Sequence, residues 1–81
     1  MARLLVIDDE KAILDALARV LERDGHTVVA ESRSTRALDL DLARFDLVIT
    51  DVMMPDMDGF ELVRRMRDRV DCPILFLTAK T

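Results

Sequence analysis

Three aspartates follow short apolar runs, and carboxylates gathered in this way can bind a metal ion. Asp8 and Asp9 come directly after residues 4–7, and Asp51 comes directly after residues 46–50. If these runs are neighbouring strands, the three carboxylates converge and repel one another, so that one keeps its proton unless a cation neutralises them. Mg²⁺ suits such a cluster because it binds one or two carboxylates, keeps several waters and accepts a phosphate oxygen.

The chemistry open to this cluster is the transfer of a phosphoryl group to a carboxylate. A carboxylate beside such an ion can act as a nucleophile toward phosphorus and form an aspartyl phosphate. The metal would neutralise charge on the group in transit. Thr78 closes a third apolar run, and its hydroxyl could donate a hydrogen bond to the newly attached group. An added charge of about −1.5 to −2 could then reorganise the surrounding loops.

Each of these residues also has a simpler explanation. Asp8 and Asp9 could cap the following helix and favour its dipole. Asp51 could be a turn residue, and Thr78 could be an ordinary strand end. The proline and the glycine that follow Asp51 make a simple turn insufficient, and the placement of all four residues after predicted strands favours a shared site.

The elements that must position these residues are four strands and three helices in alternation. Apolar residues are continuous in the predicted strands, which is typical of strands covered on both faces, and they follow helical spacing in the segments between. The predicted strands are residues 4–7, 27–30, 46–50 and 73–78, and the predicted helices lie near residues 13–21, 37–43 and 60–66. Strict alternation predicts an α/β parallel sheet with right-handed crossovers, whose sites lie at the carboxyl ends of the strands.

Glycine and polar residues mark the ends of the predicted helices. Gly25 is predicted to end the first helix, Ser34 to cap the second, and Asp58 with Glu61 to form a capping box at the third. An EF-hand calcium loop around Asp56 and Asp58 is rejected, because its first and twelfth positions would be a methionine and an arginine.

Composition narrows the class of protein. A chain of 81 residues with 51% hydrophobic and 35% charged residues is one small globular domain or a piece of one. The net charge of −4 argues against a nucleic-acid-binding face. The lone Cys72 excludes an internal disulfide and fits a reducing compartment. The apolar run near the start of the sequence is too short for a signal sequence or a membrane span. We therefore expect a cytoplasmic protein with no membrane partner.

Three motifs together resemble the receiver domain of bacterial two-component response regulators. The motifs are LLVIDDE, DLVITDVMMPDMDGFEL and PILFLTAKT, and their mutual spacing fits over the whole chain. The central motif is the specific one, with an aspartate that closes a strand, a proline four residues later and a glycine eight residues later. The resemblance implies a flavodoxin-like parallel sheet with strand order 2-1-3-4.

The resemblance also implies a role for each site residue. Asp51 would be the phospho-acceptor, with a sensor histidine kinase as the donor, and Thr78 would be the switch hydroxyl. Mg²⁺ would bind Asp9 directly, Asp8 largely through water, the acceptor Asp51, and the backbone carbonyl of Met53. The implied function is a signalling module rather than a turnover enzyme. Its output would be transcription regulation through a DNA-binding domain of the parent protein.

The family's pattern continues past the last residue of this sequence. By the resemblance, residues 1–81 would be an incomplete receiver domain that lacks the fifth strand, the last helices and the lysine that pairs with the phosphoryl group. Lys80 is not that lysine, so weakened phosphorylation is expected. A fourth strand without a neighbour would be a bare hydrophobic edge, which predicts self-association through that strand or by exchange of elements.

Two other functions stay open at this point. An inert, self-associating fragment would keep the acidic pocket and bind metal only. A Mg²⁺-dependent phosphohydrolase would also use an aspartate nucleophile, but such enzymes usually carry a second aspartate two residues later as the general acid. Met53 occupies that position here and cannot transfer a proton, which counts against turnover.

Overall fold

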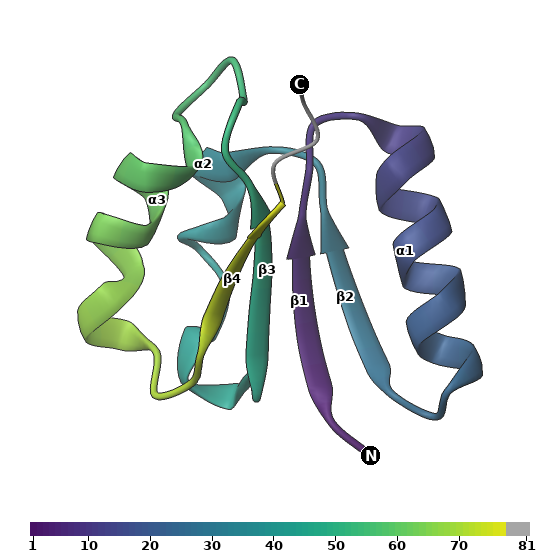
Figure 1. Ribbon diagram of the computed structural model, residues 1–81. Helices are drawn as coiled ribbons and strands as arrows, with labels where there is room; N and C mark the ends of the chain where they lie inside the picture. The colour runs from purple at the N-terminus through teal and green to yellow at the C-terminus, as the bar shows by residue number, and fades with distance from the viewer. Residues whose placement is uncertain (78–81) are drawn as a thin grey trace.

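Residues 1–77 are described by the computed structural model, and they form a four-stranded parallel sheet with helices on both faces (Figure 1). The strands are β1 (Arg3–Ile7), β2 (Thr27–Glu31), β3 (Leu47–Asp51) and β4 (Ile74–Leu77). Their order across the sheet is β2-β1-β3-β4, and every neighbouring pair is parallel. The predicted α/β class and the strand order 2-1-3-4 are confirmed.

The register of the sheet brings the ends of its central strands to one edge. Ile7, the last residue of β1, lies beside Thr50 of β3 and beside Glu31 of β2. Asp51, the last residue of β3, lies beside Leu77 of β4. The residues that follow β1 and the residue that ends β3 therefore emerge together at the carboxyl edge, which is at the top of Figure 1.

The helices cover the two faces unequally. Helix α1 (Lys11–Arg23) covers one face alone, while α2 (Ser34–Ala37) and α3 (Gly59–Met66) cover the other (Figure 1). Two single turns of 3-10 helix complete the second face, at Leu42–Arg44 and Arg67–Arg69. In the part of the chain that the structure describes, no helix is long and apolar enough to cross a membrane.

The core forms two apolar clusters because successive residues of a strand point to opposite faces of the sheet. Leu5 and Ile7 are fully buried in a cluster with side chains of α2, α3 and β3. Val6, between them, is fully buried in a second cluster with Leu14 of α1 and Ile49 of β3. The continuous apolar runs of the central strands β1 and β3 thus correspond to strands that are covered on both faces, as predicted, whereas the outer strands β2 and β4 are only partly covered.

The second helix differs from its prediction. A helix over residues 37–43 capped by Ser34 was expected, but α2 begins at Ser34 and ends at Ala37 after a single turn. Arg33 occupies the N-cap position, and no side chain among residues 1–77 caps the helix. Ala37 and Leu42 pack into the same apolar cluster from two separate turns. Apolar residues on either side of a bend can therefore have helical spacing without forming one helix.

The end of the first helix matches its prediction. Gly25 has a φ of 91°, in the left-handed region that a residue with a Cβ rarely adopts. Its amide donates a hydrogen bond to the carbonyl of Glu22 at 3.0 Å, and the amide of His26 donates to the carbonyl of Leu21 at 3.2 Å. These bonds satisfy carbonyls that the last turn of α1 would otherwise leave without a partner.

Candidate functional site

Three of the predicted site residues come together at the carboxyl edge of the sheet. Asp8 and Asp9 follow β1, and Asp51 ends β3. One carboxylate oxygen from each of the three residues lies within 4.8 Å of the other two. The expectation that the carboxylates converge is met by this geometry, and oxygen donors so close together suit a hard divalent cation.

Two of the three carboxylates in this cluster are buried, which disfavours their charged forms. Asp8 is 2% exposed and Asp51 is 9% exposed, while Asp9 reaches solvent. Burial raises the pKa of Asp8 above its ordinary value, and the nearby charges of Asp51, Asp9 and Glu10 raise this pKa further. A hydrogen bond from the amide of Glu10 to Oδ1 of Asp8, at 2.9 Å, opposes the rise in pKa. A cation in the cluster would favour the ionised form.

The helix-cap explanation accounts for little of this arrangement. Helix α1 begins at Lys11, with Glu10 at the N-cap position and no side-chain cap. The hydrogen bond that Asp8 accepts comes from the amide of Glu10 itself, before the first turn of the helix. Capping of α1 therefore does not explain why Asp9 and Asp51 lie beside Asp8.

The backbone around Asp51 is held by a close approach of α3 to the end of β3. The amide of Gly59 donates to the carbonyl of Val52 at 2.8 Å. A Cβ on Gly59 would collide with the carbonyl oxygen of Asp51 and lie 3.0 Å from Cα of Val52. The hydroxyl of Thr50 donates to the carbonyl of Asp51 at 3.1 Å. Only glycine fits at position 59, which is a constraint that the motif spacing alone could not reveal.

Two other residues singled out in the sequence, Met53 and Asp58, lie between β3 and α3. Met53 follows β3 and is 76% exposed. Thr78 lies outside the described residues. Asp58 caps α3 as predicted, because its Oδ1 accepts a hydrogen bond from the amide of Glu61 at 2.9 Å. Glu61 itself forms ion pairs with two arginines of α3.

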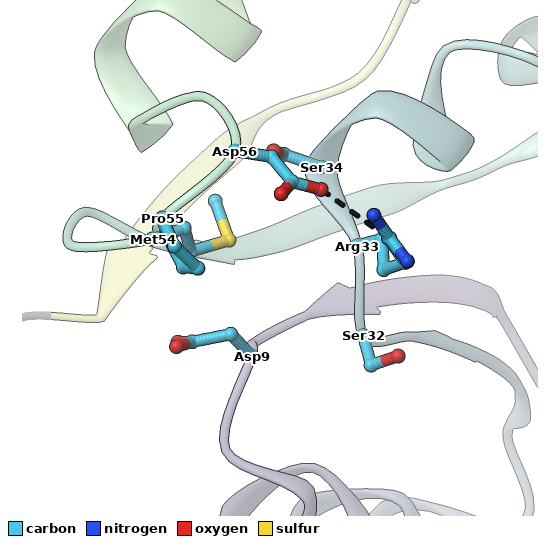
Figure 2. A pocket seen from close by; sticks show the side chains of 7 residues that line it. All are labelled: Asp9, Ser32, Arg33, Ser34, Met54, Pro55 and Asp56. Carbon is cyan, nitrogen blue, oxygen red and sulfur yellow. Dashed lines mark hydrogen bonds and ion pairs between the residues drawn. The ribbon is translucent and has the colours of Figure 1, made fainter.

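A groove of about 280 Å³ adjoins the acidic cluster on the side of β2 (Figure 2). Its lining residues are Asp9, Ser32, Arg33, Ser34, Met54, Pro55 and Asp56. Nε of Arg33 lies 3.3 Å from Oδ2 of Asp56, and the hydroxyl of Thr35 lies 3.4 Å from the same oxygen. No sequence pattern indicated this contact, because Arg33 and Asp56 are 23 residues apart and belong to different loops.

Comparison with known proteins identifies the family. The sequence profile of the family described as "Response regulator receiver domain" matches residues 4–81. The chain superimposes with a TM-score of 0.90 and 36% identity on the N-terminal domain of a response regulator receiver protein from Methanoculleus marisnigri JR1, over 99% of this chain and 68% of that one. It superimposes with a TM-score of 0.88 and 39% identity on the Vibrio cholerae chemotaxis protein CheY4, over 100% of this chain and 71% of that one.

Longer regulators are also similar in sequence. The Bacillus subtilis transcriptional regulatory protein SpaR is 50% identical over all of this chain, which spans 37% of its length. The transcriptional regulatory protein YvrH of Bacillus subtilis strain 168 is 43% identical over 99% of this chain and 35% of its own length. The chain thus spans little more than a third of these relatives. Sequence profile, fold and relatives agree, and the chain belongs to the response regulator receiver domain family.

Proposed function

We propose that the chain accepts a phosphoryl group on Asp51 from a sensor histidine kinase, as the phospho-acceptor module of a two-component system. The observation that carries this proposal is the convergence of the Asp8, Asp9 and Asp51 carboxylates within 4.8 Å. Membership of the receiver family supports the same role. We assign residues 1–81 to this module.

The donor set fits Mg²⁺. Asp9 would bind the ion directly, Asp8 largely through water, and Asp51 together with the backbone carbonyl of Met53 would complete the protein's share of the ligands. When bound, the ion offsets the negative charges of the carboxylates and of the incoming phosphoryl oxygens. The pKa of Asp8 is raised chiefly by burial and further by the charges of Asp51, Asp9 and Glu10, which supports this assignment because a bound cation would favour the ionised carboxylates.

The reaction at Asp51 is a transfer between two nucleophiles. A carboxylate oxygen of Asp51 attacks phosphorus, the bond between phosphorus and the donor's imidazole nitrogen breaks, and the nitrogen keeps the electron pair. The burial of Asp51 limits the access of water to the acyl phosphate that results. The hydroxyl of Thr78 is proposed as the donor of a hydrogen bond to the attached group.

Transcription is the proposed output of the whole protein. This step is supported by the names of the relatives, since SpaR and YvrH are described as transcriptional regulatory proteins and this chain spans 37% and 35% of their lengths. A turnover phosphohydrolase is disfavoured because Met53 stands two residues after Asp51 and carries no proton to donate.

Phosphorylation can be tested directly with a small donor. We expect incubation with acetyl phosphate and Mg²⁺ to add the mass of one phosphoryl group, measured on the intact chain, and we expect Asp51→Asn to abolish the adduct. Asp41→Asn is the matched control, since Asp41 is an exposed carboxylate before the 3-10 turn at the amino end of β3. Mg²⁺ binding without any adduct would instead favour a fragment that binds metal only.

Self-association is a second candidate property, favoured by the outer edge of β4. No strand pairs with this edge among residues 1–77. Leu75 is 53% exposed and Phe76 is 38% exposed, and the ring of Phe76 packs against that of the exposed Phe60 at a centroid distance of 5.0 Å. We propose pairing of β4 with a second copy, or exchange of elements, as the way in which this edge is covered.

A further inference from the structure

The loop between β3 and α3 carries the proposed metal ligand Met53, yet its middle has little backbone support. Its ends are fixed, by the hydrogen bond from Gly59 to the carbonyl of Val52 at 2.8 Å and by the cap that Asp58 provides. Between these points, the backbone of residues 53–57 makes no hydrogen bond with another backbone group of residues 1–77. The position of the Met53 carbonyl therefore depends on contacts made by side chains of the loop.

Those contacts are of two kinds. Met54 and Met57 pack against the apolar cluster on the α3 side of the sheet. The polar contact is made by Asp56, whose Oδ2 accepts from Nε of Arg33 at 3.3 Å and from the hydroxyl of Thr35 at 3.4 Å. We call Arg33, Thr35 and Asp56 the loop clasp. It joins the segment after β3 to the segment after β2.

The loop clasp is anchored on the β2 side. The amide of Arg33 donates to Oε2 of Glu31, the last residue of β2, at 3.0 Å. Thr35 belongs to α2, whose first residue, Ser34, is 1% exposed. Asp56 thus contacts a segment that is itself fixed to the sheet. In Figure 2, the Arg33–Asp56 ion pair lies on one side of the groove, while Asp9 lies across the groove from Met54 and Pro55.

We infer that the loop clasp positions the β3–α3 loop so that the Met53 carbonyl is held at the acidic cluster, and that it thereby strengthens Mg²⁺ binding. The inference rests on the proposed function. A ligand that is already held in place loses less conformational freedom when the metal binds, so the loop clasp raises affinity without touching the ion. Arg33, Thr35 and Asp56 are therefore positioning residues.

Arg33→Ala distinguishes this effect from simple electrostatics. Removal of a positive charge near three carboxylates should strengthen the binding of a cation through long-range attraction. Loss of the loop clasp should instead weaken the binding of the cation. Arg33 is 57% exposed and Asp56 is 27% exposed at their side chains, so we expect Mg²⁺ binding to weaken by about two- to fivefold, the range for a partly exposed ion pair.

The experiment is a calorimetric Mg²⁺ titration of the chain and its variants. We expect Arg33→Ala and Thr35→Val to bind more weakly, and we expect the exchanged pair Arg33→Asp with Asp56→Arg to recover part of the affinity. Arg44→Ala is the matched control, because Arg44 forms a similar exposed ion pair with Asp41 at 3.7 Å, at the amino end of β3. The Mg²⁺ affinity of Arg44→Ala should equal that of the unsubstituted chain.

A second measurement needs no metal. The methyl resonances of Met54 and Met57, observed by NMR on methyl-labelled chain, should shift in Arg33→Ala, while that of the fully buried Met66 should not. Equal or tighter Mg²⁺ binding by Arg33→Ala, in a chain that does bind Mg²⁺, would overturn the inference and leave the proposed function standing. Absence of Mg²⁺ binding and of the acyl phosphate in the unsubstituted chain would overturn both.

Discussion

Asp8 is a buried carboxyl whose charged form opposes folding. Its carboxyl is buried beside Asp51 and Asp9, and its pKa is raised, chiefly by burial. The folded chain therefore holds this proton up to a higher pH than the unfolded chain, where the pKa is near 3.8. Stability contributed by the protonated group is present below that value and is lost as the pH rises through the folded pKa. Above the folded pKa, the charge of the buried Asp8 carboxylate opposes folding.

Asp8→Asn should therefore raise the free energy of unfolding at neutral pH in the absence of Mg²⁺, because an amide carries no charge to be buried. The difference in the free energy of unfolding between Asp8→Asn and the unsubstituted chain should shrink as the pH falls. It should disappear once the Asp8 carboxyl is protonated in both the folded and the unfolded state. Urea denaturation at a series of pH values measures this difference. Added Mg²⁺ should stabilise the unsubstituted chain more than the variant. If Asp8→Asn is less stable than the unsubstituted chain at neutral pH without metal, the conclusion that the charge of Asp8 opposes folding is wrong.

At the scale of elements, two predicted N-caps had opposite outcomes. Asp58 caps α3 through the amide of Glu61, as its place before a run of helical spacing predicted. Ser34 instead became the first residue of α2, where its buried hydroxyl oxygen has no hydrogen-bond partner among the described residues. The local signal was stronger at Asp58, because Glu61 follows three residues later and completes a capping box, whereas Ala37 follows Ser34 at that spacing. The prediction without a capping box is the one that was wrong.

Substitution by alanine should separate these two residues. Asp58→Ala is expected to lower the free energy of unfolding by about 1 kcal/mol, the usual loss for an N-cap. Ser34→Ala should change it by less than about 0.5 kcal/mol or raise it, because a buried hydroxyl without a partner is replaced by an apolar group. Urea denaturation midpoints of the two variants give the comparison. A loss of stability in Ser34→Ala as large as in Asp58→Ala would show that Ser34 does act as a cap.

For the whole molecule, much of the architecture was predictable because it follows from periodicity. Continuous apolar runs predicted the strands, and alternation predicted a parallel sheet with its sites at the carboxyl edge. The neighbouring position of the first and third strands, which brings Asp8, Asp9 and Asp51 together, was implied by the family resemblance. The contact between Arg33 and Asp56 was not predictable, because it joins two loops whose paths no periodic pattern describes. Sequence reasoning located the acidic cluster and missed the residues that support the loop beside it.

The exposed edge of β4 gives a prediction at this scale. Leu75→Lys should weaken self-association, because a charged side chain on an edge strand opposes pairing with a second copy. Sedimentation velocity over a range of concentrations measures the change. Val20→Lys is the control, since Val20 is similarly exposed, at 55% against 53% for Leu75, but lies on α1. An unsubstituted chain that remains monomeric at the highest concentration would rule out the proposed pairing.

The absence of a side chain at position 59 has a mechanical consequence. The first turn of α3 lies directly against the peptide that carries Asp51, with no room even for a methyl group between them. No gap between Gly59 and the Asp51 peptide could take up a displacement. We therefore expect a displacement of the strand end, such as one driven by new charge on the proposed acceptor Asp51, to be transmitted directly to the first turn of α3.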